Sequence, residues 1–310
     1  MERANSIAIP RRRAAIALLV AALVAPIVVG TQVNRVETPR FVWHDGVAAE
    51  IPPAGTGVRL EADTPSGHKV LTVITQKDGT VSIGRDNHGG SSGNEASLAS
   101  TAVSGKNPCP NCPTECKDGA YSLLSYKEST GLNWYFKRSS APSNVGADAA
   151  QSALIAAANR VKNSSNACRI TDQVSAVHTF LGDTTASSNI SKDIRCLAND
   201  NQSTVDFAPL NAPAVTCAWF SVLPGVDEVS AADIRINSGT KWTTKPGSSS
   251  CRRAYDVQGL AAHEFGHAFG LGHVSPSHGN LTMSTYGLPD CSSAYRTFGK
   301  GDVKGLQALY

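Results

Sequence analysis

The stretch HEFGHAFGLGH, from His263 to His273, decides how the rest of the chain is interpreted. Residues four apart lie on one face of an α-helix, so a helix here directs His263 and His267 toward one point. Glu264 lies beside them, where its carboxylate can reach a water on a metal without binding the metal itself. Gly270 tolerates the left-handed backbone of a helix exit, which allows the chain to bring His273 back. Three neutral imidazoles with an open fourth position are the ligand set of a catalytic zinc ion.

This stretch resembles the long zinc motif H-E-x-x-H-x-x-G-x-x-H of the metzincin metallopeptidases. The sequence from Ala262 to His273 is similar to that of the matrixin branch. Met283 stands where the methionine turn of metzincins is expected, and residues 301–310 resemble the matrixin C-terminal helix. The resemblance covers Gly119 to Tyr310. It implies an α+β metzincin-like catalytic domain with a twisted mixed sheet, two long helices and a C-terminal helix. One of the long helices carries the zinc motif, and a small β-rich segment precedes the domain.

The resemblance also implies an activity, that of a zinc-dependent endopeptidase with one catalytic Zn²⁺. The metal ligands are then His263, His267 and His273, with Glu264 as the general base and Met283 as an apolar floor beneath the ligands. The substrate is a protein or peptide. The alternative is a metzincin-like extracellular binding module without turnover. The intact Glu264 favours the peptidase, because a pure binder has no need of a general base.

Composition narrows the classes of partner. The net charge is +3 and the charged fraction 17%, so nothing predicts a nucleic-acid partner. The apolar fraction of 41% is normal for a globular chain, and a monomer is expected. Structural Ca²⁺ is conceivable, but the scattered aspartates form no pattern that supports it.

The N-terminus has the form of an export segment. Arg11, Arg12 and Arg13 precede an apolar run from Ala14 to Gly30. Such a run is typical of a cleaved signal, and its length also allows a retained membrane anchor. Either interpretation places the rest of the chain outside the membrane, secreted or anchored, and membrane contact is expected only if the segment is retained. The predicted divisions are 1–30, 31–105 and 106–310.

Residues 31–105 are interpreted as a propeptide that covers the cleft, or as a spacer or accessory β-module. Val70–Thr75 and Thr80–Ile83 flank an Asp-Gly turn and predict a β-hairpin, while residues 86–105 have the composition of a linker. The chain lacks the P-R-C-G-x-P-D cysteine switch of matrixins, so cysteine-based latency is not expected.

The catalytic region shows the expected alternation of elements. A helix is predicted over Asp148–Lys162, and Asp256 is a plausible N-cap for the zinc helix. Asp302 is predicted to begin the last helix, as its N-cap or as a buried anchor. Predicted strands cover Leu132–Phe136, Val174–Phe180, Val205–Phe207, Cys217–Phe220 and Ser230–Asn237. The last of these resembles the matrixin edge strand, with which substrate backbone would pair.

Eight cysteines, an even number in an exported chain, favour disulfides. Connectivity cannot be deduced from sequence, so all pairings are hypotheses. Cys109 and Cys112 are expected to pair locally or with cysteines elsewhere, and the other hypotheses are Cys251–Cys291, Cys168–Cys196 and Cys116–Cys217. The histidines expected not to bind metal are His44, His68, His88, His178 and His278.

Overall fold

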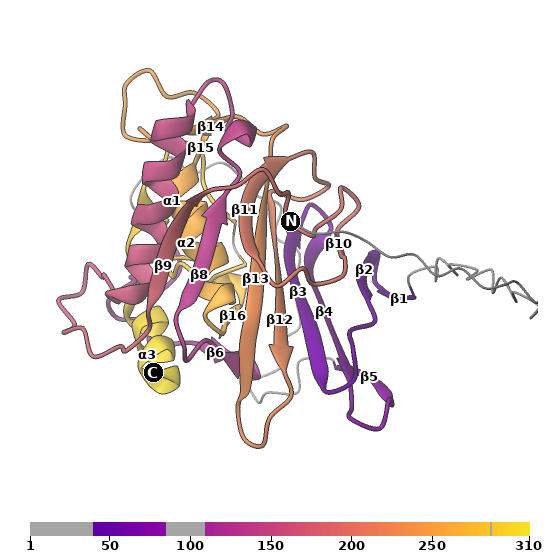
Figure 1. Ribbon diagram of the computed structural model, residues 1–310. Coiled ribbons are helices and arrows are strands. Elements are labelled where there is room, and N and C mark those ends of the chain that lie inside the picture. The colour runs from indigo at the N-terminus through magenta and orange to yellow at the C-terminus, as the bar shows by residue number, and fades with distance from the viewer. Residues whose placement is uncertain (1–39, 85–108, 286) are drawn as a thin grey trace, which may run out of the picture. The chain divides into compact units, whose positions relative to one another are not determined.

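The computed structural model describes residues 40–84, 109–285 and 287–310 (Figure 1). The apolar run of the leader and the Gly/Ser-rich segment 86–105 lie outside the described residues, so their interpretations stay predictions. Among the described residues, no helix combines the length and the apolar character needed to cross a bilayer.

A nine-stranded mixed sheet forms the framework, in the order β5-β4-β3-β12-β13-β11-β8-β9, with β7 paired to β13. Strand β12 runs antiparallel to both of its neighbours, whereas β13, β11, β8 and β9 are parallel to one another. The strands are β3 (Thr56–Thr64), β4 (Gly67–Thr75), β5 (Val81–Gly84), β7 (Tyr126–Lys127), β8 (Leu132–Phe136), β9 (His178–Asp183), β11 (Ser203–Ala208), β12 (Ala214–Ser221) and β13 (Asp227–Asn237).

The remaining elements are short strands and helices. Three small sheets are formed by β1 (Phe41–His44), β2 (Val47–Glu50) and β10 (Arg195–Cys196), by β14 (Trp242–Thr243) and β15 (Tyr255–Asp256), and by β6 (Ser122–Leu123) and β16 (Leu271–Gly272). The α-helices are α1 (Ala147–Lys162), α2 (Val257–Ala268) and α3 (Lys300–Leu309), and the 3₁₀ turns are η1 (Arg138–Ser140), η2 (Pro276–His278) and η3 (Ala294–Arg296).

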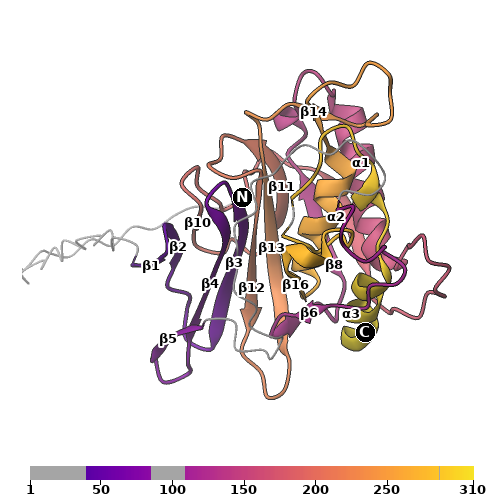
Figure 2. The same cartoon turned by 180° about the vertical axis from the view of Figure 1, so that it is seen from behind.

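The sheet has an apolar core on each face. Helices α1 and α2 cover one face of the sheet (Figure 2). On this face Trp134 of β8 packs edge-on against Phe265 of α2, with ring centroids 5.1 Å apart. The sheet β1-β2-β10 covers the other face, and its apolar residues share a core with Leu60 of β3 and Trp219 of β12. Because side chains alternate along a strand, the opposite face of β3 directs its polar residues toward the helix side.

Every residue of α2 is buried, because the helix packs against the sheet, α1 and η3. Asp256 is its N-cap, as predicted, and its carboxylate accepts a hydrogen bond from the Gly259 amide at 2.9 Å. The Arg296 guanidinium donates two 2.7 Å hydrogen bonds to the same buried carboxylate. The ion pair therefore holds η3 against the start of the helix that carries the histidines.

Most predicted elements are confirmed, including β8, α1 and the hairpin β4–β5. The strand predicted over Val174–Phe180 is wrong at its start, since β9 begins at His178. Val177 is about half exposed, and alternation without burial does not make a strand there. Asp302 does not begin α3: the helix begins at Lys300, with Gly299 as N-cap, and Asp302 is the buried anchor.

The edge-strand prediction is wrong in a way that matters for the site. Residues 230–237 belong to β13, which lies between β12 and β11 and is buried on both faces over most of its length. Strand β12, and not β13, is the strand that pairs with the N-terminal strand β3. Alternation along β13 reflects two buried faces of slightly different polarity and not an exposed edge.

All eight cysteines are in disulfides, and two of the predicted pairings are wrong. Cys251–Cys291 is confirmed, and Cys109 pairs locally with Cys112. The others are Cys116–Cys168 and Cys196–Cys217, in place of Cys168–Cys196 and Cys116–Cys217. Register explains the change, because the Cys217 side chain lies on the face of β12 that packs against the β1-β2-β10 sheet, where Cys196 lies.

Gly270 offers a test of the chain reversal after α2. It has a φ of +96°, and a Cβ atom there would lie 2.3 Å from the Tyr126 carbonyl oxygen. Gly225 has a φ of +97° with no atom within 4 Å of such a Cβ, so it isolates the backbone effect. Gly225→Ala should lower the free energy of unfolding by about 1–2 kcal/mol. Gly270→Ala should lower it by at least about 3 kcal/mol, because a steric clash adds to the strain.

Urea unfolding of both variants at one protein concentration measures the difference. Equal losses for the two variants would show that the close approach of Tyr126 does not constrain the reversal.

Candidate metal centre

Helix α2 and the reversal at Gly270 bring three imidazoles to one point. The Nε2 atom of His263 lies 2.8 Å from that of His273 and 3.1 Å from that of His267. The Nε2 atoms of His267 and His273 are 3.2 Å apart. Tetrahedral zinc with Zn–N bonds of about 2.0–2.1 Å would place its ligand atoms about 3.3 Å apart. The three nitrogens therefore form one triangular face of such a site, as the motif predicted.

The other ring nitrogens explain why the Nε2 atoms converge. The Nδ1 atom of His263 lies 2.7 Å from the Thr282 carbonyl, and that of His267 lies 2.9 Å from the Leu271 carbonyl. A carbonyl can only accept, so each Nδ1 carries the proton and each Nε2 presents a lone pair. Burial lowers the pKa of His263 to about 4 and that of His267 well below its ordinary value. Neutral rings with converging lone pairs fit a bound cation, and the triad is consistent with catalytic zinc.

Glu264 is buried beside these ligands. Thr216 of β12 donates a 2.6 Å hydrogen bond from its Oγ1 to the Glu264 carboxylate. Burial raises the pKa of this carboxyl to about 8, with Asp63 and Glu61 adding to the effect. A carboxyl whose pKa lies near neutrality suits a group that must take up and release a proton.

Met283, expected in the methionine turn, packs against the helix that carries the histidines. A Cβ atom at Gly266 would lie 2.4 Å from the Met283 sulfur, so the thioether packs directly against the backbone of α2. The buried Asp302 carboxylate accepts hydrogen bonds from the amides of Thr282 at 2.9 Å and Met283 at 3.2 Å. Because the Thr282 carbonyl orients His263, helix α3 indirectly supports a metal ligand.

The N-terminal hairpin supplies further groups that sequence analysis did not assign. The Nε2 atom of His68 on β4 lies 2.9 Å from Nδ1 of His273, and a Glu61 oxygen of β3 lies 3.3 Å from the same atom. The second oxygen of Asp63 is 3.7 Å from Nε2 of His273 and 3.9 Å from Nε2 of His263. The missed signal was the alternation of charged and apolar residues along 58–63, which places polar residues on one face of β3.

Charges on this hairpin neutralise one another. Arg59 donates to Glu61 at 2.5 Å, and His68 lies 3.0 Å from Glu61 and 3.2 Å from the first oxygen of Asp63. Burial disfavours the imidazolium of His68, but the two carboxylates outweigh it and raise its pKa to about 10. Burial likewise disfavours the Asp63 anion, yet the imidazoles of His273 and His68 hold its pKa below the usual range. Asp63 therefore presents a carboxylate to the triad.

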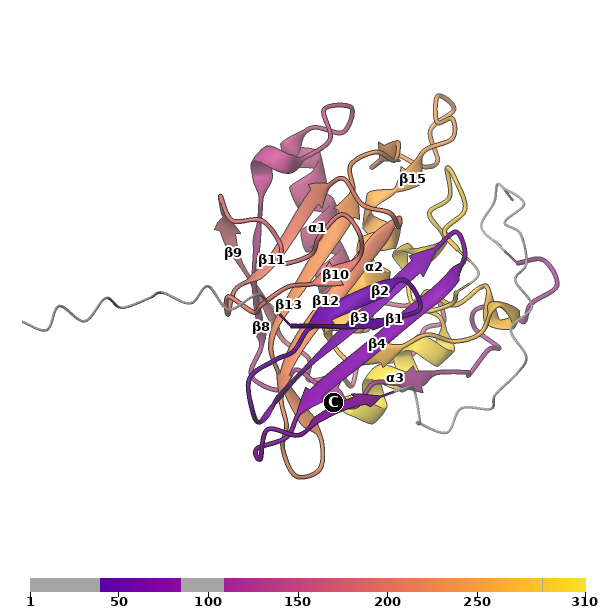
Figure 3. The same cartoon turned by 90° about the vertical axis from the view of Figure 1, so that its right-hand side faces the viewer.

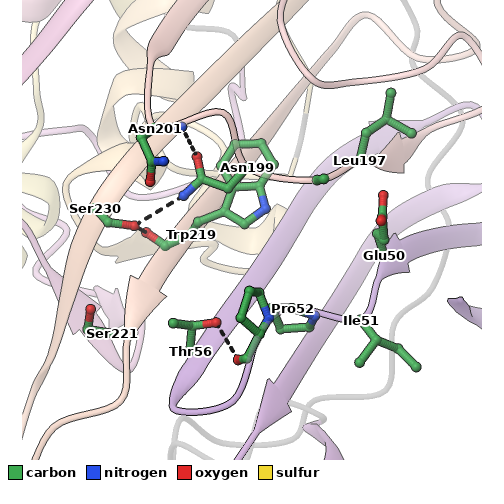
Figure 4. A pocket seen from close by; sticks show the side chains of 12 residues that line it. Glu50, Ile51, Pro52, Thr56, Leu197, Asn199, Asn201, Trp219, Ser221 and Ser230 are labelled. Atoms are coloured by element: carbon green, nitrogen blue, oxygen red, sulfur yellow. Dashed lines mark hydrogen bonds between the residues drawn. The ribbon is translucent and has the colours of Figure 1, made fainter. Parts of the chain in front are cut away.

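Two other features lie apart from this centre. His278 lies 2.9 Å from the Asp118 carboxylate and is not part of the triad. A pocket of 470 Å³ opens between the end of β2 and the Asn199 loop, with Trp219 among its lining residues (Figure 4). It contains no histidine, and Asn199 and Ser230 bond to each other there at 3.4 Å.

Comparisons with known proteins agree with the geometry. The family model of the matrixins, peptidase family M10, matches residues 152–310, more than half of the chain. Human matrix metalloproteinase-20 is 35% identical over 105 residues, which are 34% of this chain and 19% of the human protein. The chain thus matches about a fifth of the length of that relative. The matched range contains the histidine triad, Glu264 and the methionine turn, and the chain belongs to the matrixin family of metallopeptidases.

Proposed function

We propose that the protein is a secreted zinc-dependent endopeptidase that hydrolyses peptide bonds with Glu264 as the general base. The observation that carries the proposal is the convergence of three Nε2 atoms beside a buried carboxyl on the same helix. A site that only bound a cation would need the imidazoles but not Glu264.

The protein substrate would lie along β12. Thr216 of this strand contacts the Glu264 carboxylate, so a chain extended along β12 crosses the site beside the general base. Strand addition provides backbone hydrogen bonds that do not depend on side chains, which suits an enzyme that cleaves polypeptides. Membership of a peptidase family supports the same substrate class.

The reaction divides between the metal and this carboxyl group. A zinc ion held by the triad would acidify a water molecule and polarise the scissile carbonyl. Glu264 accepts the proton of the attacking water and then donates it to the departing amine nitrogen. Thr216 holds the carboxylate in place during both transfers. No covalent link between enzyme and substrate is required.

Cysteine usage supports the proposed location. Four disulfides account for all eight cysteines, and such bonds persist in oxidising compartments. Secretion, with the leader either cleaved or retained as an anchor, and a monomeric state complete the proposal.

Glu264→Gln tests the general base. The amide keeps the size of the side chain but cannot accept a proton, so casein hydrolysis should fall by about 100-fold or more. Because β3 covers β12, hydrolysis is measured on the full chain and again after limited proteolysis between residues 84 and 109. Zinc content should be unchanged, and Glu115→Gln, on a partly exposed carboxylate, is the matched control. Cleavage that survives in the Glu264 variant would remove this residue from the mechanism.

His267→Ala tests the metal. Wild type should retain about one zinc ion per chain after dialysis, and the variant should lose most of it because only two ligands of the triad remain. Elemental analysis of the protein measures the ratio. His44→Ala, a change on β1 outside the triad, should leave it unaltered. Equal zinc in all three proteins would place the ion elsewhere.

A further inference from the structure

The N-terminal strand β3 occupies the side of β12 along which substrate is proposed to bind. The two strands are antiparallel over seven residue pairs, from Val215 opposite Ala62 to Ser221 opposite Thr56 (Figure 3). Since β13 takes the other side of β12, the strand has no free edge over this length. A polypeptide cannot pair with β12 there while β3 remains in place.

The same strand also reaches the metal centre. Asp63 follows Ala62, the last residue of β3 that pairs with β12, and its two oxygens have different neighbours. The first lies 3.2 Å from Nδ1 of His68, which leaves the second to face the triad. That second oxygen lies 3.7 and 3.9 Å from two of the three Nε2 atoms. These distances exceed the about 3.3 Å edge of a zinc tetrahedron by only a few tenths of an ångström.

We infer that Asp63 is the fourth ligand of the zinc ion in the intact chain, and that residues 40–84 thereby hold the enzyme latent. This inference rests on the proposed function above. One carboxylate oxygen completes the coordination and excludes the water that the reaction consumes. The paired strand β3 excludes the substrate at the same time, so a single segment blocks both reactants.

The remaining contacts of the hairpin have a different consequence. Glu61 and His68 contact Nδ1 of His273, and such outer contacts would also suit a permanent part of the active site. Asp63 distinguishes the two roles, because a permanent part of a hydrolase would leave the fourth position open to water. The closeness of its second oxygen to two of the three Nε2 atoms favours a segment that must leave before turnover.

Release requires more than the loss of one metal bond. Val58 and Leu60 of β3 share the second core with Trp219 of β12, and all three are buried. Removal of Asp63 should therefore open the metal to small ligands while β3 still covers β12. Opening β12 to a polypeptide requires cleavage of the chain between residues 84 and 109 and departure of the whole segment.

The experiment uses the full chain with Co²⁺ in place of zinc, because cobalt reports its ligands through visible absorption. Wild type, Asp63→Ala and Asp63→Asn are compared, with Asp78→Ala as the matched control. Asp78 lies in the exposed turn between β4 and β5, and its carboxylate accepts a hydrogen bond from the nearby Thr80 amide. Acetohydroxamate, a small chelating ligand of zinc, is then titrated into each zinc protein.

The Asp63 variants should change the cobalt spectrum, and Asp78→Ala should retain that of wild type. Acetohydroxamate should bind Asp63→Ala more tightly than wild type by about 10-fold or more, a typical effect of a metal-site contact. Identical spectra and equal affinities for wild type and Asp63→Ala would overturn the inference. Because Asp63→Asn preserves size and hydrogen bonding to His68, it shows that any change comes from the lost carboxylate and not from misfolding.

Failure of the proposed function would look different. If the spectra depend on Asp63 but no peptide is cleaved after removal of residues 40–84, the ligand assignment holds and the peptidase activity fails. If cleavage depends on Glu264 but the cobalt spectra are the same in wild type and the Asp63 variants, the peptidase activity holds and the latency mechanism fails.

Discussion

Three imidazole nitrogens held within 3.2 Å of one another are the constraint on which the rest of the structure depends. Lone pairs at this distance repel unless they share a cation, so each ring needs a partner that fixes its orientation. Backbone carbonyls of Thr282 and Leu271 hold two of the rings. Both carbonyls lie in segments that follow α2, and metal affinity is therefore coupled to the folding of the helix exit and the methionine turn.

The catalytic centre could be predicted because its information is local. The spacing of His263 and His267 is a property of one helix, and the chain reverses after it with positive φ at Gly270, a residue type that tolerates this backbone. The buried position of Asp302 is less local, since its carboxylate bonds to the amides of a turn 20 residues earlier. The sequence predicts only that Asp302 is either the N-cap of the last helix or a buried anchor. It shows that a carboxylate lies near the start of a helix but not which amides donate to it.

What could not be predicted depends on strand order. Hydrophobic alternation predicts the two faces of β13 but not which strands lie beside it, so the prediction of an edge strand is wrong for this central strand. The predicted pairings of Cys196 and Cys217 are wrong for the same reason, since the observed disulfide depends on how two sheets pack against each other. The role of β3 was missed because the alternation of Arg59, Glu61 and Asp63 predicts a polar face but does not show that β12 lies beside it.

The use of a carboxylate at the fourth position agrees with the rest of the chain's chemistry. A free thiolate binds zinc well, but it can also attack disulfides by exchange. In this protein all eight cysteines are already paired, and Cys196–Cys217 links β10 to β12. The carboxylate of Asp63 takes no part in such exchange, so it can face the metal without putting any of these disulfides at risk. Oxygen is a weaker ligand than thiolate for zinc. The seven paired residues of β3 and the apolar contacts of Leu60 supply the stability that the metal bond alone lacks.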